Sequence, residues 1–387
     1  MRLASAVTRL ASEGAFEVLA RAKRLEARGR TVIHLEIGQP DFPTPAHIVE
    51  AGIEALRRGE TRYTPAAGIQ PLREAIAAYV GHWFGIPATA DQVVVAPGAK
   101  PVLFYTMLAL LEPGDECIYP DPGFPTYESV TRFTGAVPVP ARLRMANDFR
   151  FDVDELVSLV TPRTKLLILN SPANPTGGTL TLSDLERIAE LAQRHDFYVL
   201  SDEIYSRLLY DSRHHSIAAL PGMGERTVVL DGFSKTFSMT GWRLGYGIFP
   251  RPLAPHIEVL QINANSCPAA FTQWAALAAL TGPQEAVERM VAEFRRRRDA
   301  IVAGLNRLPG VRCLTPRGAF YAFPNIAGTG LRAHELADRL LEEAGVATLA
   351  GTAFGAGGEG FLRLSYATSL EQIEQALARM GEFLSSL

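Results

Sequence analysis

The sequence contains only four lysines, Lys23, Lys100, Lys165 and Lys235, so a reaction that needs a lysine amine has few candidates. Lys235 lies in a loop rich in glycine and serine, just past an apolar run and eight residues before Arg243. At such a position the amine can form a Schiff base, and the arginine can hold a phosphate. Taken alone, an ordinary loop lysine is the simpler interpretation, so the case depends on the residues that accompany it.

Polar and aromatic residues follow several other apolar runs. Asp202 ends one run and is followed three residues later by Tyr205, and Asn174 lies in an Asn-Pro-Thr-Gly turn after another. Phe124 follows a third run in the segment Asp-Pro-Gly-Phe. Each has an ordinary alternative, since Asp202 alone could cap a helix and the asparagine segment alone is a turn.

The segment Gly98-Ala99-Lys100 lies between an apolar run and an apolar helix pattern, with Pro101 near the first helical position. The free backbone amides of Ala99 and Lys100 would then point at an anion on the helix axis. Together these run ends supply an anion cradle, a flat aromatic ring, an amide, a carboxylate with a phenol, and a lysine with an arginine. That set suits pyridoxal phosphate.

These residues need a scaffold that brings the ends of several strands together. Six short apolar runs alternate with longer amphipathic stretches, at 92–96, 116–119, 136–139, 165–169, 198–201 and 227–230. Several runs are apolar on both faces, which is typical of strands buried between two layers of helices. The alternation predicts an α/β fold with a mostly parallel sheet, in which ligands bind at the carboxyl ends of the strands.

The two ends of the chain follow a different pattern. An amphipathic helix predicted over 13–28 has no place in the central sheet, and from about residue 285 helices alternate with isolated strands. We predict an N-terminal segment (1–45) that joins a small α+β domain (285–387), with a large cofactor-binding domain between them (46–284). We interpret the charged run at 293–299 as a solvated helix face.

Composition excludes several other classes of protein. The 387 residues carry a net charge of -3, with no strongly basic region for nucleic acid, no apolar run long enough for a membrane span and no secretory signal. Three widely spaced cysteines fit a reduced protein, and we expect a cytoplasmic one. We expect no metal site, because His214 and His215 have the pattern of a surface pair. The glycine-rich segment 355–360 precedes a strand pattern, so it does not indicate a dinucleotide site.

Taken together, the motifs resemble the class I and II aminotransferases of fold type I, which depend on pyridoxal phosphate. The resemblance extends from about residue 31 to 380, and it is closest to the branch that contains bacterial aspartate aminotransferases. It implies a seven-stranded sheet between helices, a smaller α+β domain and a homodimer. The segments that carry it are 174–177, 201–205, 234–245 and 363–367.

The resemblance also implies catalytic and cofactor-binding roles. Lys235 would form the Schiff base, and Asp202 would pair with the ring nitrogen. Tyr205 and Asn174 would bind the phenolic oxygen, and Phe124 would stack on the ring.

Further roles concern the phosphate and the substrate. The phosphate would be bound by Arg243, Ser234 and the cradle formed by Gly98, Ala99 and Lys100. Tyr63 would reach the phosphate bound by a neighbouring subunit. Arg363 would bind the substrate α-carboxylate near the Gly38 backbone and Asn174.

The sequence departs from the family pattern at Gly232, where many members carry a hydroxyl that binds the phosphate. We predict an amino-acid aminotransferase that moves an amino group to a 2-oxo acid by a ping-pong route. A C–S β-lyase is the alternative, although the residues after the Asn-Pro-Thr-Gly turn lack the aromatic that lyases often have there. A pyridoxal-phosphate sensor of a transcription factor is a third. The segment 101–111 contains no basic residue, which disfavours strict aspartate specificity.

Overall fold

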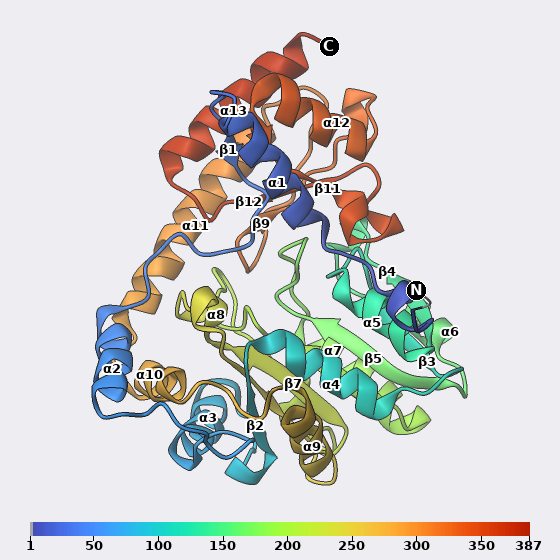
Figure 1. The fold of residues 1–387 in the computed structure, drawn as a ribbon. Coiled ribbons are helices and arrows are strands. Elements are labelled where there is room, and N and C mark those ends of the chain that lie inside the picture. Colours follow the sequence, from blue (N-terminus) through green and yellow to red (C-terminus); the bar gives the residue numbers. More distant parts are fainter. Residues whose placement is uncertain (1–2) are drawn as a thin grey trace.

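The computed structural model describes residues 3–387 and contains a central seven-stranded sheet (Figure 1). All neighbouring strands pair in parallel except for β8, which is antiparallel to both of its neighbours. The predicted α/β fold is therefore confirmed. In spatial order the strands are β2 (Val93–Ala96), β8 (Gly245–Ile248), β7 (Thr227–Gly232), β6 (Tyr198–Asp202), β5 (Thr164–Asn170), β3 (Glu116–Asp121) and β4 (Val137–Arg142).

Strand β8 is the one strand of this sheet that the apolar runs did not reveal. Its sequence, Gly-Tyr-Gly-Ile, lacks the β-branched run that marks the other strands. The structure shows why glycine stands there. A Cβ on Gly245 would lie 2.6 Å from the backbone nitrogen of Ala99, and one on Gly247 would lie 2.4 Å from the ring of Phe249. The glycines therefore allow a helix to approach the sheet closely.

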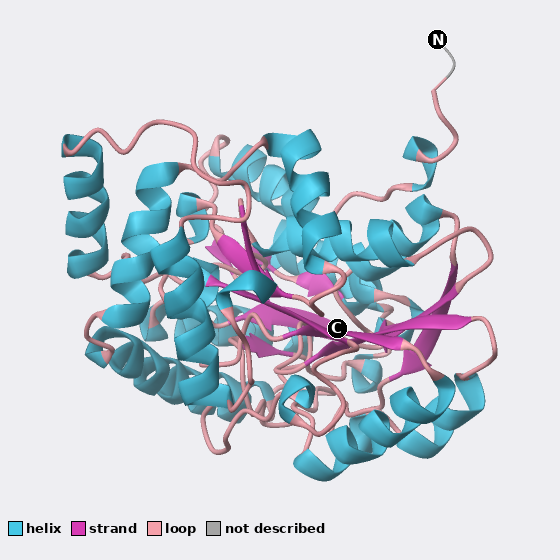
Figure 2. Cartoon of the chain, turned by 90° about the horizontal axis from the view of Figure 1, so that it is seen from below, coloured by secondary structure: helices cyan, strands magenta, loops and turns pink. Residues whose placement is uncertain are grey.

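Helices cover both faces of the sheet (Figure 2). Along β2, Val94 and Ala96 contribute to one hydrophobic cluster while Val93 and Val95 contribute to another, as the two-residue period of a strand requires. The helices of this part are α2 (Ala46–Arg57), α3 (Gln70–Phe84), α4 (Ala99–Leu110), α5 (Thr126–Thr134), α6 (Val153–Leu159), α7 (Leu182–His195), α8 (Phe233–Thr236), α9 (Ala254–Asn265) and α10 (Ala270–Thr281).

Helix α1 (Gly14–Glu26) lies with the C-terminal part of the chain beyond the carboxyl edge of the sheet, whereas the residues before it lie beside α5 (Figure 1). Strand β1 (Ile33–His34) pairs in parallel with β10 (Val346–Ala347), which ties the N-terminal segment to the C-terminal part. The domain boundaries after residues 45 and 284 stay a prediction. The other elements here are α1 (Gly14–Glu26), α11 (Glu285–Leu305), β9 (Tyr321–Ala322), α12 (Ala333–Arg339), β11 (Leu349–Ala350), β12 (Leu362–Ser365) and α13 (Leu370–Ser385).

The interpretation of 293–299 as a solvated helix face is wrong for two of its arginines. Arg297 and Arg298 are buried, with 6% and 4% of their surface exposed. Arg297 Nη1 lies 2.7 Å from a carboxylate oxygen of Asp41, and Arg298 Nη1 lies 2.6 Å from one of Asp211. These acidic partners are far away in the sequence, so the helix pattern alone did not show that the charges are paired and can be buried.

The interpretation of the adjacent histidines as a surface pair is also half wrong. His215 is exposed, but the side chain of His214 is only 4% exposed, and its Nε2 lies 2.7 Å from Oε2 of Glu203. The Glu203 carboxylate, itself buried, also accepts a hydrogen bond from Ser216. The His214 side chain is thus a polar partner for the buried carboxylate of Glu203. Within residues 3–387, no histidine, cysteine and acidic side chains gather in the way a metal ion would require.

The described helices include none that is both long enough and apolar enough to cross a membrane.

Candidate active site

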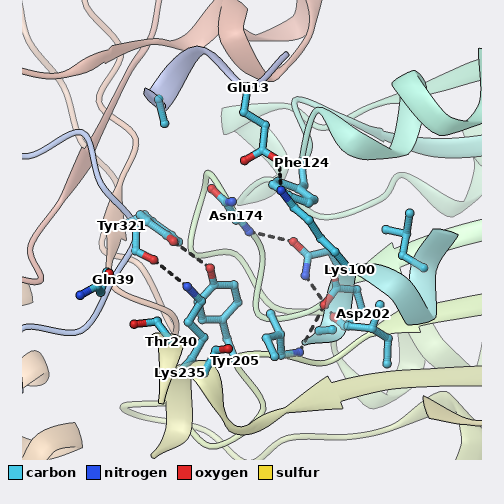
Figure 3. A pocket seen from close by; sticks show the side chains of 18 of the residues that line it. Glu13, Gln39, Lys100, Phe124, Asn174, Asp202, Tyr205, Lys235, Thr240 and Tyr321 are labelled. Carbon is cyan, nitrogen blue, oxygen red and sulfur yellow. Dashed lines mark hydrogen bonds and ion pairs between the residues drawn. The ribbon is translucent and has the colours of Figure 1, made fainter. Parts of the chain in front are cut away.

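A cavity of about 460 Å³ opens at the carboxyl ends of β5, β6 and β7, beneath the chain ends (Figure 3). It is lined by most of the predicted site residues, which come from segments far apart in the sequence. Gly98 and Tyr63 are the two that do not line it. The predicted residues that do are Gly38, Ala99, Lys100, Phe124, Asn174, Asp202, Tyr205, Ser234, Lys235, Arg243 and Arg363.

Lys235 lies in the short helix α8, which follows directly on β7. Its Nζ donates a 2.6 Å hydrogen bond to the carbonyl oxygen of Gly38. Burial lowers the pKa of Lys235 to about 8, and the positive charges of Arg363 and Arg243 act in the same direction. The amine therefore releases its proton more readily than a solvent-exposed lysine, as a nucleophile or base requires.

Asp202 ends β6 at the floor of the cavity and is 6% exposed. The hydroxyl of Tyr127 donates a 2.6 Å hydrogen bond to its Oδ2, and the backbone N–H of Ile204 donates to its Oδ1 at 3.3 Å. Burial raises the pKa of Asp202 to about 6 despite these donors. A cation placed against this carboxylate would compensate the cost of burying its charge.

The side chains of Tyr205 and Asn174 lie on the other side of the cavity (Figure 3). The hydroxyls of Tyr205 and Tyr321 are 2.7 Å apart and share a hydrogen bond. The backbone N–H of Asn174 donates to Oδ1 of Asn170 at 2.8 Å, which anchors the turn to the end of β5. Both side chains therefore offer polar atoms to the cavity from fixed positions.

Arg363 on β12 is buried and 3% exposed, yet no acidic side chain within residues 3–387 forms an ion pair with it. Its Nη2 donates to the backbone carbonyl of Glu36, and its Nη1 lies 3.4 Å from Oδ1 of Asn174. Its Nε has no hydrogen-bond partner, and its guanidinium lies 4.6 Å from the ring centre of Tyr321. A buried guanidinium with free donor capacity is suited to bind a carboxylate.

The backbone at 98–100 has the predicted form of a glycine followed by the start of a helix. Helix α4 begins at Ala99, and Gly98 precedes it with a φ of 100°, a conformation that favours glycine. A Cβ on Gly98 would lie 2.3 Å from Nη2 of Arg243, so only glycine lets this guanidinium approach the helix terminus. Backbone amides and an arginine therefore face the same point, with Ser234 on the cavity wall nearby.

The packing of two strands gives a reason why residue 232 is a glycine without a hydroxyl. A Cβ on this residue would lie 2.9 Å from Cα of Gly245 on the neighbouring strand. With the backbones this close, β7 and β8 leave no space for a serine or threonine. The close packing of these two strands thus accounts for the glycine at position 232, where many family members carry a hydroxyl.

Phe124 and Tyr63 differ in their relation to the cavity. Phe124 lines it, with its ring 5.6 Å from that of Tyr127 at an interplanar angle of 81°. Tyr63 is 89% exposed and does not reach the cavity of its own chain. Its predicted role across a dimer interface stays a prediction.

Among the lining residues that were not predicted from the sequence, three have ionisable side chains: Glu13, Tyr127 and Tyr321. Tyr127 lies in the first turn of α5, only three residues after Phe124, and this short spacing was a usable signal. Glu13 and Tyr321 come from the chain ends and carry no motif that indicates a role.

Comparison with known proteins places the whole chain in one group. The model of the family described as "Aminotransferase class I and II" matches residues 30–380. An aspartate aminotransferase of Pyrococcus abyssi is 44% identical over 92% of each chain. An arginine–pyruvate transaminase of Pseudomonas aeruginosa is 41% identical over 98% of each chain.

Solved structures agree with the sequence comparison. The aspartate aminotransferase of Thermus thermophilus with maleate has a TM-score of 0.95 and 39% identity, covering 99% of this chain and 100% of that one. An alanine aminotransferase of Pyrococcus furiosus also has a TM-score of 0.95, at 33% identity with complete coverage of both chains. The relatives thus share one fold although their names state different substrates.

Proposed function

This chain belongs to the class I and II aminotransferase family and is an amino-acid aminotransferase, and we propose that it uses pyridoxal 5′-phosphate bound through Lys235 in the cavity described above. The observation that carries this proposal is the buried amine of Lys235, which faces the buried carboxylate of Asp202 across one cavity. The proposed reaction moves an amino group from an L-amino acid to a 2-oxo acid in two half-reactions.

The residues of the cavity fit this cofactor. The start of α4 and Arg243 converge where a phosphate would bind, at a point that a Cβ on Gly98 would obstruct. Asp202 would hold the pyridinium nitrogen, Phe124 would cover the ring, and Tyr205 with Asn174 would bind the phenolic oxygen. The ring nitrogen would supply the positive charge that the buried Asp202 carboxylate lacks in the protein alone.

The cofactor supplies, when bound, an aldehyde for a covalent link to an amine and a ring that accepts electrons. Arg363 binds the substrate α-carboxylate and thereby directs Cα toward Lys235. Nζ of Lys235, whose pKa is lowered to about 8, accepts the proton from Cα and returns it on the same side of the cavity. Asp202 stays ionised against a positive partner, while Tyr205 donates its hydroxyl proton into a hydrogen bond.

A half-reaction screen tests the function. The purified enzyme, loaded with pyridoxal phosphate, is mixed with each common L-amino acid in turn, and the visible absorbance of the bound cofactor is followed. We expect at least one amino acid to remove the absorbance and a 2-oxo acid to restore it. Release of pyruvate and ammonia from cystathionine without any amino acceptor would instead identify a C–S β-lyase.

We further propose a homodimer in which Tyr63 of one subunit binds the cofactor phosphate of the other. Tyr63 is 89% exposed, so its hydroxyl is available to a second chain. Replacing Tyr63 by phenylalanine should weaken cofactor binding roughly ten- to a hundredfold, because a hydrogen bond to a charged acceptor contributes about 1.5–3 kcal/mol. Cofactor retention during dialysis measures this.

Tyr198→Phe is the control, because that tyrosine lies at the start of β6, away from the cavity. A protein that sediments as a monomer yet keeps full cofactor and full activity would contradict the shared site. The predicted cytoplasmic location stays a prediction.

A further inference from the structure

Glu13 directs its carboxylate into the mouth of the cavity from the residue that precedes α1 (Figure 3). It forms an ion pair with Nζ of Lys100 and accepts a 3.4 Å hydrogen bond from the hydroxyl of Thr126. Its side chain is 23% exposed, and Nζ of Lys100 lies 5.4 Å from the ring centre of Phe124. The pair thus spans the entrance, with the acid from the N-terminal segment and the base from α4.

The cationic groups of the cavity can be assigned one by one. Its four basic side chains are those of Lys100, Lys235, Arg243 and Arg363. If the proposed function holds, the last three serve the cofactor and the substrate α-carboxylate. Among residues 3–387 of this chain, Lys100 is then the one lining cation left for a carboxylate in a substrate side chain, and Glu13 already neutralises it.

The surfaces beside this pair are apolar. The lining of the cavity also includes Ala15 and Phe16 from α1, Ile37, and Leu103 from α4. Phe16 is 63% exposed, so it can cover a ligand at the entrance without being part of the core. These walls offer contact to an apolar side chain and no hydrogen bond to a carboxylate.

The Glu13 carboxylate lines the same cavity as Arg363. Burial lowers the pKa of Arg363, and the negative charge of Glu13 is among those that counter this effect. The side chain of a substrate held by Arg363 would share this cavity with Glu13. A second carboxylate there meets a like charge, which disfavours binding.

We propose that Glu13, by neutralising Lys100, makes this aminotransferase selective for L-amino acids with uncharged, mainly apolar side chains and excludes dicarboxylic amino acids. This inference rests on the proposed function and adds the substrate class to it. Glu13 would then be a specificity-determining residue contributed by the N-terminal segment.

Replacing Glu13 by glutamine tests this proposal. The change removes the negative charge and frees Lys100, so we expect the ratio of kcat/KM for L-aspartate to that for L-leucine to rise at least tenfold. Dissociation constants provide a second measurement that requires no turnover. The variant should bind the dicarboxylate maleate at least tenfold more tightly relative to 4-methylpentanoate than the wild type does.

Three further variants separate a charge effect from a structural one. Glu13→Asp keeps the charge and should retain the wild-type ratio, and Glu17→Gln removes an exposed acid of α1 and should not change it. Adding Lys100→Gln to Glu13→Gln should lower the ratio again, because the freed cation is then lost.

Two results would overturn the proposal: a wild type that already prefers aspartate to leucine, or a Glu13→Gln variant with an unchanged ratio in both measurements. Either result leaves the aminotransferase mechanism intact, provided that leucine or another amino acid still removes the cofactor absorbance. If no amino acid does so, the proposed function fails, and this inference fails with it.

Discussion

Replacing Lys235 by alanine is expected to abolish transamination. The variant loses both the amine that we propose binds the cofactor covalently and the base that we propose moves the Cα proton. Proton transfer by a positioned side chain alone contributes about 10²–10⁴-fold in rate, so the loss should be at least that large. Steady-state kinetics with the best substrate of the half-reaction screen measure it, and the absorbance of the covalently bound cofactor should disappear at the same time.

Lys165→Ala is the matched control for this variant. Lys165 lies on β5 beside the ring of Tyr198 and does not line the cavity, so its loss should leave both signals as in the wild type. Near-native turnover in Lys235→Ala would refute the proposed mechanism. No other lysine is a plausible replacement, since Lys100 lies at the cavity mouth paired with Glu13.

Replacing Arg363 by lysine is expected to impair the amino-acid half-reaction while sparing the cofactor. The planar guanidinium can form two parallel hydrogen bonds with a carboxylate, and an ammonium cannot reproduce that geometry. Loss of one charge-assisted hydrogen bond costs about 1.5–3 kcal/mol, which corresponds to a rise of roughly ten- to a hundredfold in the apparent dissociation constant of the amino acid. Stopped-flow measurement of the half-reaction over a range of amino-acid concentrations gives this constant.

Arg295→Lys serves as the control, because that arginine is half exposed and pairs with Asp211 at the surface. Cofactor absorbance should be the same in both variants. Unchanged substrate saturation in Arg363→Lys would show that another group binds the carboxylate, and loss of cofactor would show that Arg363 serves the cofactor instead.

The sequence predicted the sheet and many of the residues that line the cavity at the strand ends, for a physical reason. Parallel strands buried on both faces must be apolar along their whole length, so their ends are visible as the points where polar residues begin. Asp202 and Asn174 lie at such points, and the structure brings them together. Strand β8 was not predicted, because glycine stands where a typical strand residue would. Gly245 is needed there because it packs closely against Ala99, which belongs to a distant segment of the chain.

The substrate side of the cavity was harder to predict. Glu13 and Tyr321 enter it from the two chain ends, and nothing local in the sequence indicates which acid or tyrosine will face a cavity. The buried Arg297 illustrates the same limit, because its partner Asp41 is more than 250 residues away. Interactions between distant segments determine these positions, and a single sequence does not display them.

The cavity is assembled from two sources: the sheet holds Lys235 and Asp202, whereas the chain ends supply Glu13 and Arg363. This division has a consequence for evolution. Mutations in residues 13–16 can alter the surface that meets a substrate side chain without changing any strand end of the central sheet. Lineages with one chemistry can therefore diverge in substrate through a short stretch of chain, and a laboratory library confined to residues 13–16 would sample new specificities while it keeps Gly38, whose carbonyl accepts a hydrogen bond from Lys235.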